Sequence, residues 1–391
     1  MSNRLPRDLW TEILVSLPVK SLLRFQCVCK SWKSLIYTST FISMHTQHSE
    51  SADNYTHLLH CSSYSKKPYQ LLQTDGSFNE FQELEYPCQM RGGDHRFVHD
   101  CKGLILFTTV IQDGLDGNRF ERLTLWNPAI RMSMTLPRPR IDVPVPKYCI
   151  HGFGFDQTSN DYKVLRMVCD MYTSFPPQVE LYRLRTGAWE TITGVDDCFQ
   201  YYLSAKTQAF VNGASHWVNV VWPMASCSPK RAVLLFDMCD EKLRVMKLPD
   251  HLSLGLGKTL DLGVSGGLLS LMENTKPHDV YLSCNIWLMK EYGVVESWTK
   301  QFTIDLEGWS CGWIFSFRNN EKILAWNRKN EKESVLYDPK THRLIKVGGI
   351  KGKGYLFGKN TFVESLVLLD KEHTRCDSKK GKKRRERHAC A

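Results

Sequence analysis

Apolar residues near the start of the chain recur every three or four positions, which is the repeat of an α-helix. Pro6 suits the first turn of a helix and Pro18 cannot continue one, so a first helix is predicted between them. The apolar stripe of this segment consists of Leu5, Leu9, Trp10, Ile13, Leu14 and Leu17.

A second apolar series follows Ser21, must contain a break, and leads to a third element that begins near Phe41. Its members are Leu22, Phe25, Val28, Cys29, Trp32 and Leu35. These segments predict a small all-α bundle over residues 1–48. A unit of about 45 residues barely forms a core of its own, yet this one is apolar on more than one helical face. The surplus apolar surface either packs on the rest of the chain or binds helices of another protein.

Residues 55–370 have a different pattern, with short alternating strands separated by polar turns, which predicts an all-β domain. Six segments follow one hairpin pattern, and their turns begin at Asp75, Asn127, Arg183, Asp237, Met289 and Asp338. Successive turns are 52, 56, 54, 52 and 49 residues apart. A repeat of this length with four strands per unit is typical of a kelch-like β-propeller, for which we expect about six blades, with five or seven as alternatives. A pair of β-sandwiches would also use short strands but does not require the repeat.

Further apolar strands preceded by glycine or asparagine lie between the hairpins, in residues 100–107, 210–218 and 263–271, and are expected to be inner strands of blades. The last of these segments begins with Gly263-Val264-Ser265-Gly266-Gly267, a literal match to the nucleophile elbow of serine hydrolases. That motif requires a helix after the serine, whereas residues 268–272 have the pattern of a strand. The match is therefore interpreted as accidental, and no catalytic residues are assigned.

The composition, with 42% hydrophobic and 24% charged residues, is that of a soluble globular protein. No apolar run approaches the roughly 20 residues of a membrane span, and the apolar run at 364–369 has only the length of a strand. No secretory signal is visible at the N-terminus, so the 14 cysteines are expected to be thiols in a reducing compartment. The spacing of the cysteines and histidines matches no metal site, and neither a metal nor another cofactor is expected.

Positive charge is concentrated at the C-terminus, where residues 371–391 hold nine Lys or Arg against three Asp or Glu. This segment is predicted to be a basic, disordered tail. Its charge cluster is a candidate nuclear-import signal, with weak attraction to nucleic acid or acidic lipid as the rival interpretation. The cluster comprises Lys379, Lys380, Lys382, Lys383, Arg384, Arg385 and Arg387. Without interleaved aromatic residues or a folded groove, sequence-specific nucleic-acid binding is not expected.

Two parts of the sequence carry a family resemblance. The first runs from Leu5-Pro6 through Leu17-Pro18-Val19-Lys20-Ser21-Leu22 to Cys29-Lys30-Ser31-Trp32 and resembles the F-box of plant F-box proteins. The second resembles the F-box-associated interaction domain of plants and includes Leu125-Trp126-Asn127-Pro128, Gly152-Phe153-Gly154-Phe155-Asp156 and the segments 160–164 and 179–182. Within that group the sequence is similar to the S-locus F-box and S-locus F-box-like proteins of self-incompatible plants, whose motifs many paralogues of other roles share.

The resemblance implies the substrate-recognition subunit of an SCF-type ubiquitin ligase, located in the cytoplasm, the nucleus or both. The F-box would dock on a Skp-type adaptor, which bridges to cullin and a RING subunit, while the β domain would bind a target protein of unknown identity. Such a receptor is not an enzyme itself and acts by bringing target lysines close to a charged ubiquitin-conjugating enzyme. Carried over by position, the adaptor-facing residues would be Leu5, Pro6, Leu9, Ile13, Leu14, Leu17, Pro18, Leu22, Val28, Cys29 and Trp32.

Two other classes remain open at this point. One is a propeller enzyme with an appended adaptor-binding helix set, which turnover of a small molecule without ligase subunits would favour. The other is a non-proteolytic scaffold, which would keep its function after losing adaptor binding.

Overall fold

The computed structural model describes most of the chain between residues 6 and 369. The described segments are 6–51, 56–60, 69–74, 80–84, 94–113, 118–141, 148–169, 177–193, 199–202, 208–223, 230–254, 258–275, 283–305, 311–316, 323–327, 334–338, 341, 343–347 and 361–369. No helix within these segments is long and apolar enough to cross a membrane.

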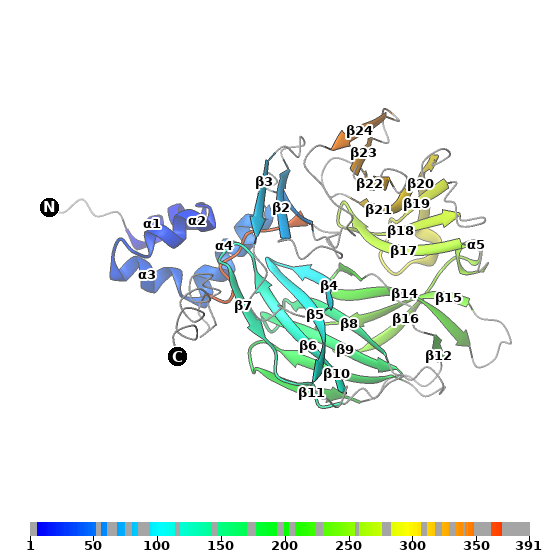
Figure 1. The fold of residues 1–391 in the computed structure, drawn as a ribbon, viewed down its shortest axis with the longest axis horizontal. Coiled ribbons are helices and arrows are strands. Elements are labelled where there is room, and N and C mark those ends of the chain that lie inside the picture. Colours follow the sequence, from blue (N-terminus) through cyan, green and yellow to red (C-terminus); the bar gives the residue numbers. More distant parts are fainter. Residues whose placement is uncertain are drawn as a thin grey trace, which may run out of the picture.

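Four helices form the N-terminal bundle, which projects from one side of a larger body of sheets (Figure 1). They are α1 (Arg7–Val15), α2 (Val19–Phe25), α3 (Lys30–Ile36) and α4 (Ser39–Ser51). The predicted first helix is confirmed, since Pro6 and Pro18 are the N-cap residues of α1 and α2. The break in the second apolar series separates α2 from α3, and the third predicted element is α4.

The described strands form six antiparallel sheets. The first sheet contains β1 (Thr56–His60), β2 (Tyr69–Thr74), β3 (Glu80–Leu84) and β25 (Thr361–Phe362). The second contains β4 (Asp94–Cys101), β5 (Leu104–Asp113), β6 (Asn118–Asn127) and β7 (Met132–Thr135). The third contains β8 (Tyr148–Asp156), β9 (Asp161–Cys169), β10 (Gln178–Arg183) and β11 (Ala188–Ile192).

The remaining three sheets follow in the same order along the chain. The fourth contains β12 (Phe199–Tyr202), β13 (Ala209–Val211), β14 (Ala214–Pro223), β15 (Lys230–Asp237) and β16 (Leu243–Lys247). The fifth contains β17 (Lys258–Ser265), β18 (Leu268–Thr275), β19 (Ser283–Met289) and β20 (Trp298–Asp305). The sixth contains β21 (Cys311–Ser316), β22 (Ile323–Asn327), β23 (Ser334–Asp338) and β24 (Arg343–Val347). Two short helices, α5 (Asp250–Ser253) and η3 (Val295–Ser297), lie in connections.

The predicted hairpins occupy the same place in every sheet. Each joins an edge strand, which is β3, β7, β11, β16, β20 or β24, to its neighbour. Five predicted turn positions are the last residues of β6, β10, β15, β19 and β23, namely Asn127, Arg183, Asp237, Met289 and Asp338. The sixth, Asp75, follows β2 directly but lies outside the described residues. The repeat of about fifty residues in the sequence therefore corresponds to one sheet per repeat.

Pairing between the two ends of the β region closes the series of sheets. His57 and Leu58 of β1 pair with Phe362 and Thr361 of β25, so the last strand completes the first sheet. Closure of this kind leaves a ring of sheets without a free end, as a propeller requires. The sequence that matched a nucleophile elbow lies at the turn from β17 to β18, and the predicted strand after it is β18, not a helix.

Apolar clusters fill the spaces between neighbouring sheets from the third to the fifth. Leu165, Trp217 and Phe236 belong to a cluster that joins the third sheet to the fourth. Val233 and Leu271 belong to a cluster that joins the fourth sheet to the fifth. Trp217 lies deep in this core, since its side chain is only 2% exposed.

A further cluster joins the helical bundle to the sheets. It contains buried residues of the helices, of the second and third sheets, and of the segment after β25, including Leu14, Leu22, Phe41, Leu125, Phe153, Leu366 and Leu368. Part of the surplus apolar surface predicted for the bundle is therefore covered by the chain itself. The apolar run at 364–369 supplies this cover and forms no strand, although its length suggested one.

Candidate functional site

Helix α1 presents apolar side chains to solvent as well as to the core. Leu14 and Val15 point inward and are 0% and 7% exposed. Leu9 and Ile13 lie one helical turn apart and are 43% and 45% exposed. Exposed large aliphatic side chains arranged in this way favour a site for another protein.

The turn between α2 and α3 adds a second exposed apolar element to the bundle. Val28 is 62% exposed, the largest exposed fraction among the exposed large hydrophobic residues of the described chain. Cys29 follows as the exposed N-cap of α3, where its Sγ accepts a hydrogen bond from the backbone N–H of Trp32 at 3.5 Å. The Ser31 hydroxyl, 3.2 Å from this sulfur, and the Trp32 N–H lower the pKa of the Cys29 thiol.

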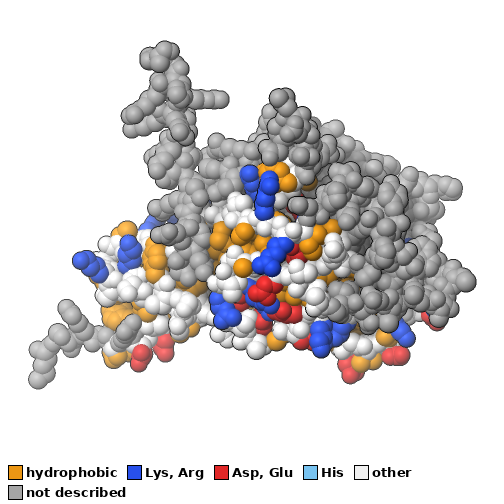
Figure 2. All heavy atoms as spheres, turned by 90° about the horizontal axis from the view of Figure 1, so that it is seen from below, with side chains coloured by type: hydrophobic (Ala, Val, Ile, Leu, Met, Phe, Trp, Pro, Cys, Tyr) orange, Lys and Arg blue, Asp and Glu red, His pale blue; other side chains and the backbone are white. Residues whose placement is uncertain are grey.

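A cluster of aromatic rings connects these two exposed elements. The ring centroid of Trp32 lies 5.3 Å from that of Trp10 on α1 and 5.3 Å from that of Phe25 on α2. Tilted ring pairs at this distance are favourable and hold three helices together. Figure 2 shows hydrophobic side chains at the surface of the end of the molecule where the helices lie.

The predicted adaptor-facing residues divide into two groups in the structure. Those that are exposed or half-buried, and therefore accessible, are Pro6, Leu9, Ile13, Leu17, Pro18, Val28, Cys29 and Trp32. Leu14 and Leu22 are 0% exposed and pack in the core, so their assignment as adaptor contacts is corrected. Buried and exposed apolar residues of the helices both recur every three or four positions. The spacing in the sequence therefore did not distinguish the buried residues from the exposed ones. Leu5 and the seven basic residues of the tail lie outside the described residues.

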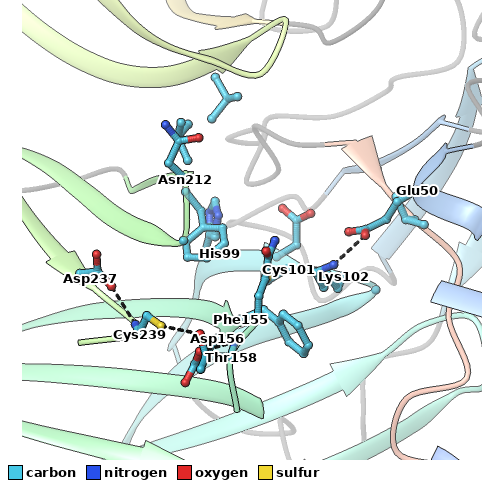
Figure 3. Close-up of a pocket in the computed structure, with 18 residues that line it drawn as sticks. Glu50, His99, Cys101, Lys102, Phe155, Asp156, Thr158, Asn212, Asp237 and Cys239 are labelled. Carbon is cyan, nitrogen blue, oxygen red and sulfur yellow. Dashed lines mark hydrogen bonds and ion pairs between the residues drawn. The ribbon is translucent and has the colours of Figure 1, made fainter. Parts of the chain in front are cut away.

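A cavity of about 690 Å³ lies among the sheets, on the side where α4 meets them (Figure 3). Hairpin turns of the second, third and fourth sheets converge there, through Lys102 and Gly103, Thr158, and Asn212. Glu50 of α4 also lines it and forms an ion pair with Lys102, with 2.7 Å between Oε2 and Nζ. The sequence could not indicate this cavity, because its walls come from turns that are far apart in the chain.

The cavity is lined by charged, polar and apolar side chains. Among the described residues that line it, no cysteine is an activated nucleophile. Burial raises the pKa of the Cys101 thiol well above its usual range, so this cysteine stays protonated. The Sγ atom of Cys239 lies 2.7 Å from the hydroxyl of Thr158, which is not a base. The arrangement suits side chains of a bound partner better than covalent catalysis.

Glu121, Cys149 and His151 form the one group of possible metal ligands among the described residues, with ligand atoms within 4.8 Å of one another. Their chemistry does not fit a metal well. The carboxylate of Glu121 already lies 2.9 Å from Nε2 of His151 and 3.5 Å from Nε of Arg166. Burial raises the pKa of Cys149 to about 12, which opposes the thiolate that a metal would need. The group is better described as a polar cluster between β6, β8 and β9.

Comparison with known proteins agrees with this architecture. The model of the F-box domain matches residues 2–43, and that of the F-box associated beta propeller domain matches residues 70–369. The chain is 30% identical over 322 residues to the F-box protein CPR1 of Arabidopsis thaliana, covering 77% of this chain and 73% of that protein. It is 26% identical over 317 residues to the F-box/kelch-repeat protein At3g23880 of the same plant, covering 77% of this chain and 80% of that protein. Since the propeller model spans most of the chain and the exposed helical bundle is an F-box, the chain belongs to the plant F-box proteins with an F-box associated β-propeller domain.

Proposed function

We propose that this chain is the substrate-recognition subunit of an SCF-type ubiquitin ligase. The F-box docks on a Skp-type adaptor, and the adaptor links it to cullin and a RING subunit. The propeller, to which we assign all six sheets as blades, holds a target protein. The chain itself makes and breaks no covalent bond, and it acts by raising the local concentration of target lysines near the charged ubiquitin-conjugating enzyme.

The observation that carries this proposal is the exposure of Leu9, Ile13 and Val28 on an F-box of which only part of the apolar surface is covered by the chain's own propeller. A partner that covered these side chains would remove apolar area from water, which is the main favourable term in protein association. The propeller enzyme alternative lacks comparable support, because the described cavity presents no activated nucleophile.

Two narrower statements rest on the sequence. The similarity to the S-locus group makes an S-RNase-type ribonuclease in pollen recognition a candidate target, which pull-down of style proteins by the wild-type receptor would test. The basic cluster of the tail is proposed to direct part of the protein to the nucleus, with the remainder in the cytoplasm. Microscopy of a tagged chain with and without residues 371–391 tests that proposal.

The decisive experiment measures adaptor affinity with surface substitutions that leave the core intact. The double variant Leu9→Asp/Ile13→Asp places two charges on the exposed side of α1. Burying each aliphatic side chain contributes about 1.5–3 kcal/mol at most, so the variant is expected to weaken binding of a purified Skp-type adaptor on the order of 100-fold or more. Leu254→Asp, at a residue 49% exposed beside α5, is the matched control. Wild-type protein that binds no adaptor, or a double variant that binds as tightly as the control, would refute the proposal.

A further inference from the structure

The segment between β25 and the tail, residues 363–369, lies between the F-box and the propeller, and we refer to it as the C-terminal strap. Its side chains Ser365, Leu366 and Leu368 are at most 1% exposed. Leu366 and Leu368 belong to the same apolar cluster as Leu14 and Leu22 of the F-box and Leu125 of the second sheet. The strap is therefore part of the surface through which the two domains touch.

Asn127 attaches the strap to the propeller. Its amide Nδ2 donates to the backbone oxygens of Ser365 and Val367, both at 2.9 Å, and lies 3.2 Å from the Ser365 hydroxyl. Its Oδ1 accepts the backbone N–H of Ala129, so both ends of the amide are engaged. The side chain is 0% exposed, and a buried amide satisfied in this way holds its partners in one geometry. This contact gives a physical role to the Leu-Trp-Asn-Pro motif.

Gly103 shows how closely the strap approaches the second sheet. A Cβ atom at Gly103 would lie 2.3 Å from the Ser365 hydroxyl oxygen and 2.7 Å from the Val363 carbonyl oxygen. Gly103 has a φ of +79° in the turn between β4 and β5. Gly213 occupies the equivalent turn between β13 and β14 with a φ of +75°, but nothing lies within 4 Å of the position of its Cβ. Alanine substitutions at Gly103 and Gly213 would strain the backbone in the same way, but only the one at Gly103 would also clash with the strap.

Glu364 attaches the strap to the F-box. Its carboxyl group faces the start of α2, where burial raises its pKa, and the backbone N–H of Val19 and the charge of Lys20 oppose that rise. The first N–H groups of a helix have no partner within the helix, and Pro18, the N-cap residue, makes no side-chain cap bond. The strap therefore places a carboxyl group near the uncapped N-terminus of α2, where negative charge is favourable. The Glu364 side chain is half-buried at this place.

A second connection joins the domains beside the strap. Glu50, near the end of α4, pairs with Lys102 in the turn between β4 and β5, next to Gly103. The backbone oxygen of Lys102 accepts a hydrogen bond of 2.9 Å from the hydroxyl of Tyr162 in the third sheet. The same turn thus contacts the F-box, the strap and a neighbouring sheet, which leaves little freedom for one domain to rotate on the other.

We propose that the C-terminal strap is a positioning element that locks the F-box in one orientation on the propeller, with Asn127 and Glu364 as positioning residues. The locked orientation is a property of this chain alone. Its consequence rests on the proposed function: a target on the propeller is presented at a fixed angle to the ubiquitin-conjugating enzyme, so that particular lysines are modified.

Hydrogen exchange of the full chain tests the lock without any ligase subunit. Asn127→Asp keeps the shape of the side chain but replaces the Nδ2 donor with an acceptor that faces the two strap carbonyls. We expect amides of α2 and of the strap to exchange about tenfold faster or more in Asn127→Asp and Gly103→Ala. Amides of β17 to β20 should keep their wild-type rates, and Gly213→Ala should leave α2 unchanged. Should Asn127→Asp not fold, Glu364→Ala serves in its place, with Glu364→Gln restoring protection because it keeps an acceptor.

Ubiquitin transfer tests the consequence. The receptor is assembled with a Skp-type adaptor, cullin, a RING subunit, the ubiquitin-conjugating enzyme and ubiquitin, and the lysines of its own propeller that become modified are mapped by mass spectrometry. Lys242, Lys290 and Lys300 are among the lysines whose modification can be compared. We expect few lysines to be modified in wild type and Gly213→Ala. We expect more lysines to be modified in Asn127→Asp and Gly103→Ala when these variants bind the adaptor equally well.

The outcomes separate the two proposals. A wild-type chain that binds no adaptor refutes the proposed function, while the exchange measurement still decides whether the strap locks the domains. Folded variants with unchanged exchange in α2 refute the lock. Faster exchange in α2 with an unchanged set of modified lysines refutes the role of the lock in presenting lysines.

Discussion

Lys163 on β9 is a buried cation whose removal should destabilise the contact between the third and fourth sheets. Its Nζ lies 2.8 Å from Oδ2 of Asp156 and 2.8 Å from Oε1 of Glu241, and the Lys163 and Asp156 side chains are each 3% exposed. Arg183 pairs with Glu241 from the other side. Burial alone would raise the pKa of both carboxyls. Hydrogen bonds from Lys163 and Ser159 hold the pKa of Asp156 below its usual range, and those from Lys163 and Arg183 do the same for Glu241.

Lys163→Met would leave the Asp156 carboxylate buried without its cation. Removing one partner of a buried ion pair costs about 3–5 kcal/mol of unfolding free energy, because the remaining charge stays desolvated. The lower end of this range is expected, since Asp156 keeps its hydrogen bonds from Thr158 and Ser159. For a domain of roughly 300 residues, a loss of about 3–5 kcal/mol corresponds to a fall in melting temperature of about 5–8 °C. Carboxyls with lowered pKa values stabilise the fold above their unfolded pKa near 4, and this contribution is lost as the pH falls through the folded values. The deficit of the variant should therefore shrink below about pH 4, where its carboxyls can protonate.

Urea denaturation and calorimetry of wild type, Lys163→Met and Lys163→Met/Asp156→Asn measure this effect. Lys247→Met, which removes an exposed lysine of β16, is the control for lost charge. The double variant should recover part of the loss, because it no longer buries an unpaired carboxylate. A change of less than about 1 kcal/mol in Lys163→Met, or one equal to that of Lys247→Met, would refute the reasoning.

Two further predictions concern titratable side chains. Burial lowers the pKa of His216 to about 4, and its Nε2 lies 2.8 Å from the hydroxyl of Tyr292 in the connection between β19 and β20. As the pH falls, His216 becomes protonated in the unfolded chain before it does so in the folded chain. The free energy of unfolding should therefore decrease by about 3 kcal/mol in total as the pH drops from about 6.5 to about 4. His216→Phe should flatten that part of the pH profile, and an unchanged profile would contradict the assignment. Cys29, exposed and with a lowered pKa, should react with iodoacetamide at pH 8 well before Cys149, whose pKa is raised to about 12. Peptide mass spectrometry measures both rates, bound adaptor should protect Cys29, and equal rates for the two cysteines would contradict the prediction.

The sequence by itself determined the helices and hairpins of this protein, because their signals are local. Pro6 and Pro18 marked the limits of the first helix, since proline lacks the N–H that a helix interior requires, and the structure shows Pro18 as the N-cap of α2. The six hairpins were recognisable because strands alternate with period two and turns use a small set of residues. The F-box motif also indicated the kind of partner, because its residues lie close together in the chain.

Only the tertiary structure decided which apolar residues remain exposed and how the domains meet. Leu9 and Leu14 belong to the same helical stripe, yet one is 43% exposed and the other is 0% exposed. The apolar segment Glu364–Leu369 had the length of a strand but serves as a strap, because Asn127, 238 residues before Ser365, binds its carbonyls. The walls of the cavity and the pair of Lys163 with Glu241 likewise join residues far apart in the chain. Such contacts leave no periodic trace in the sequence, since each depends on which surfaces the closed ring of sheets brings together.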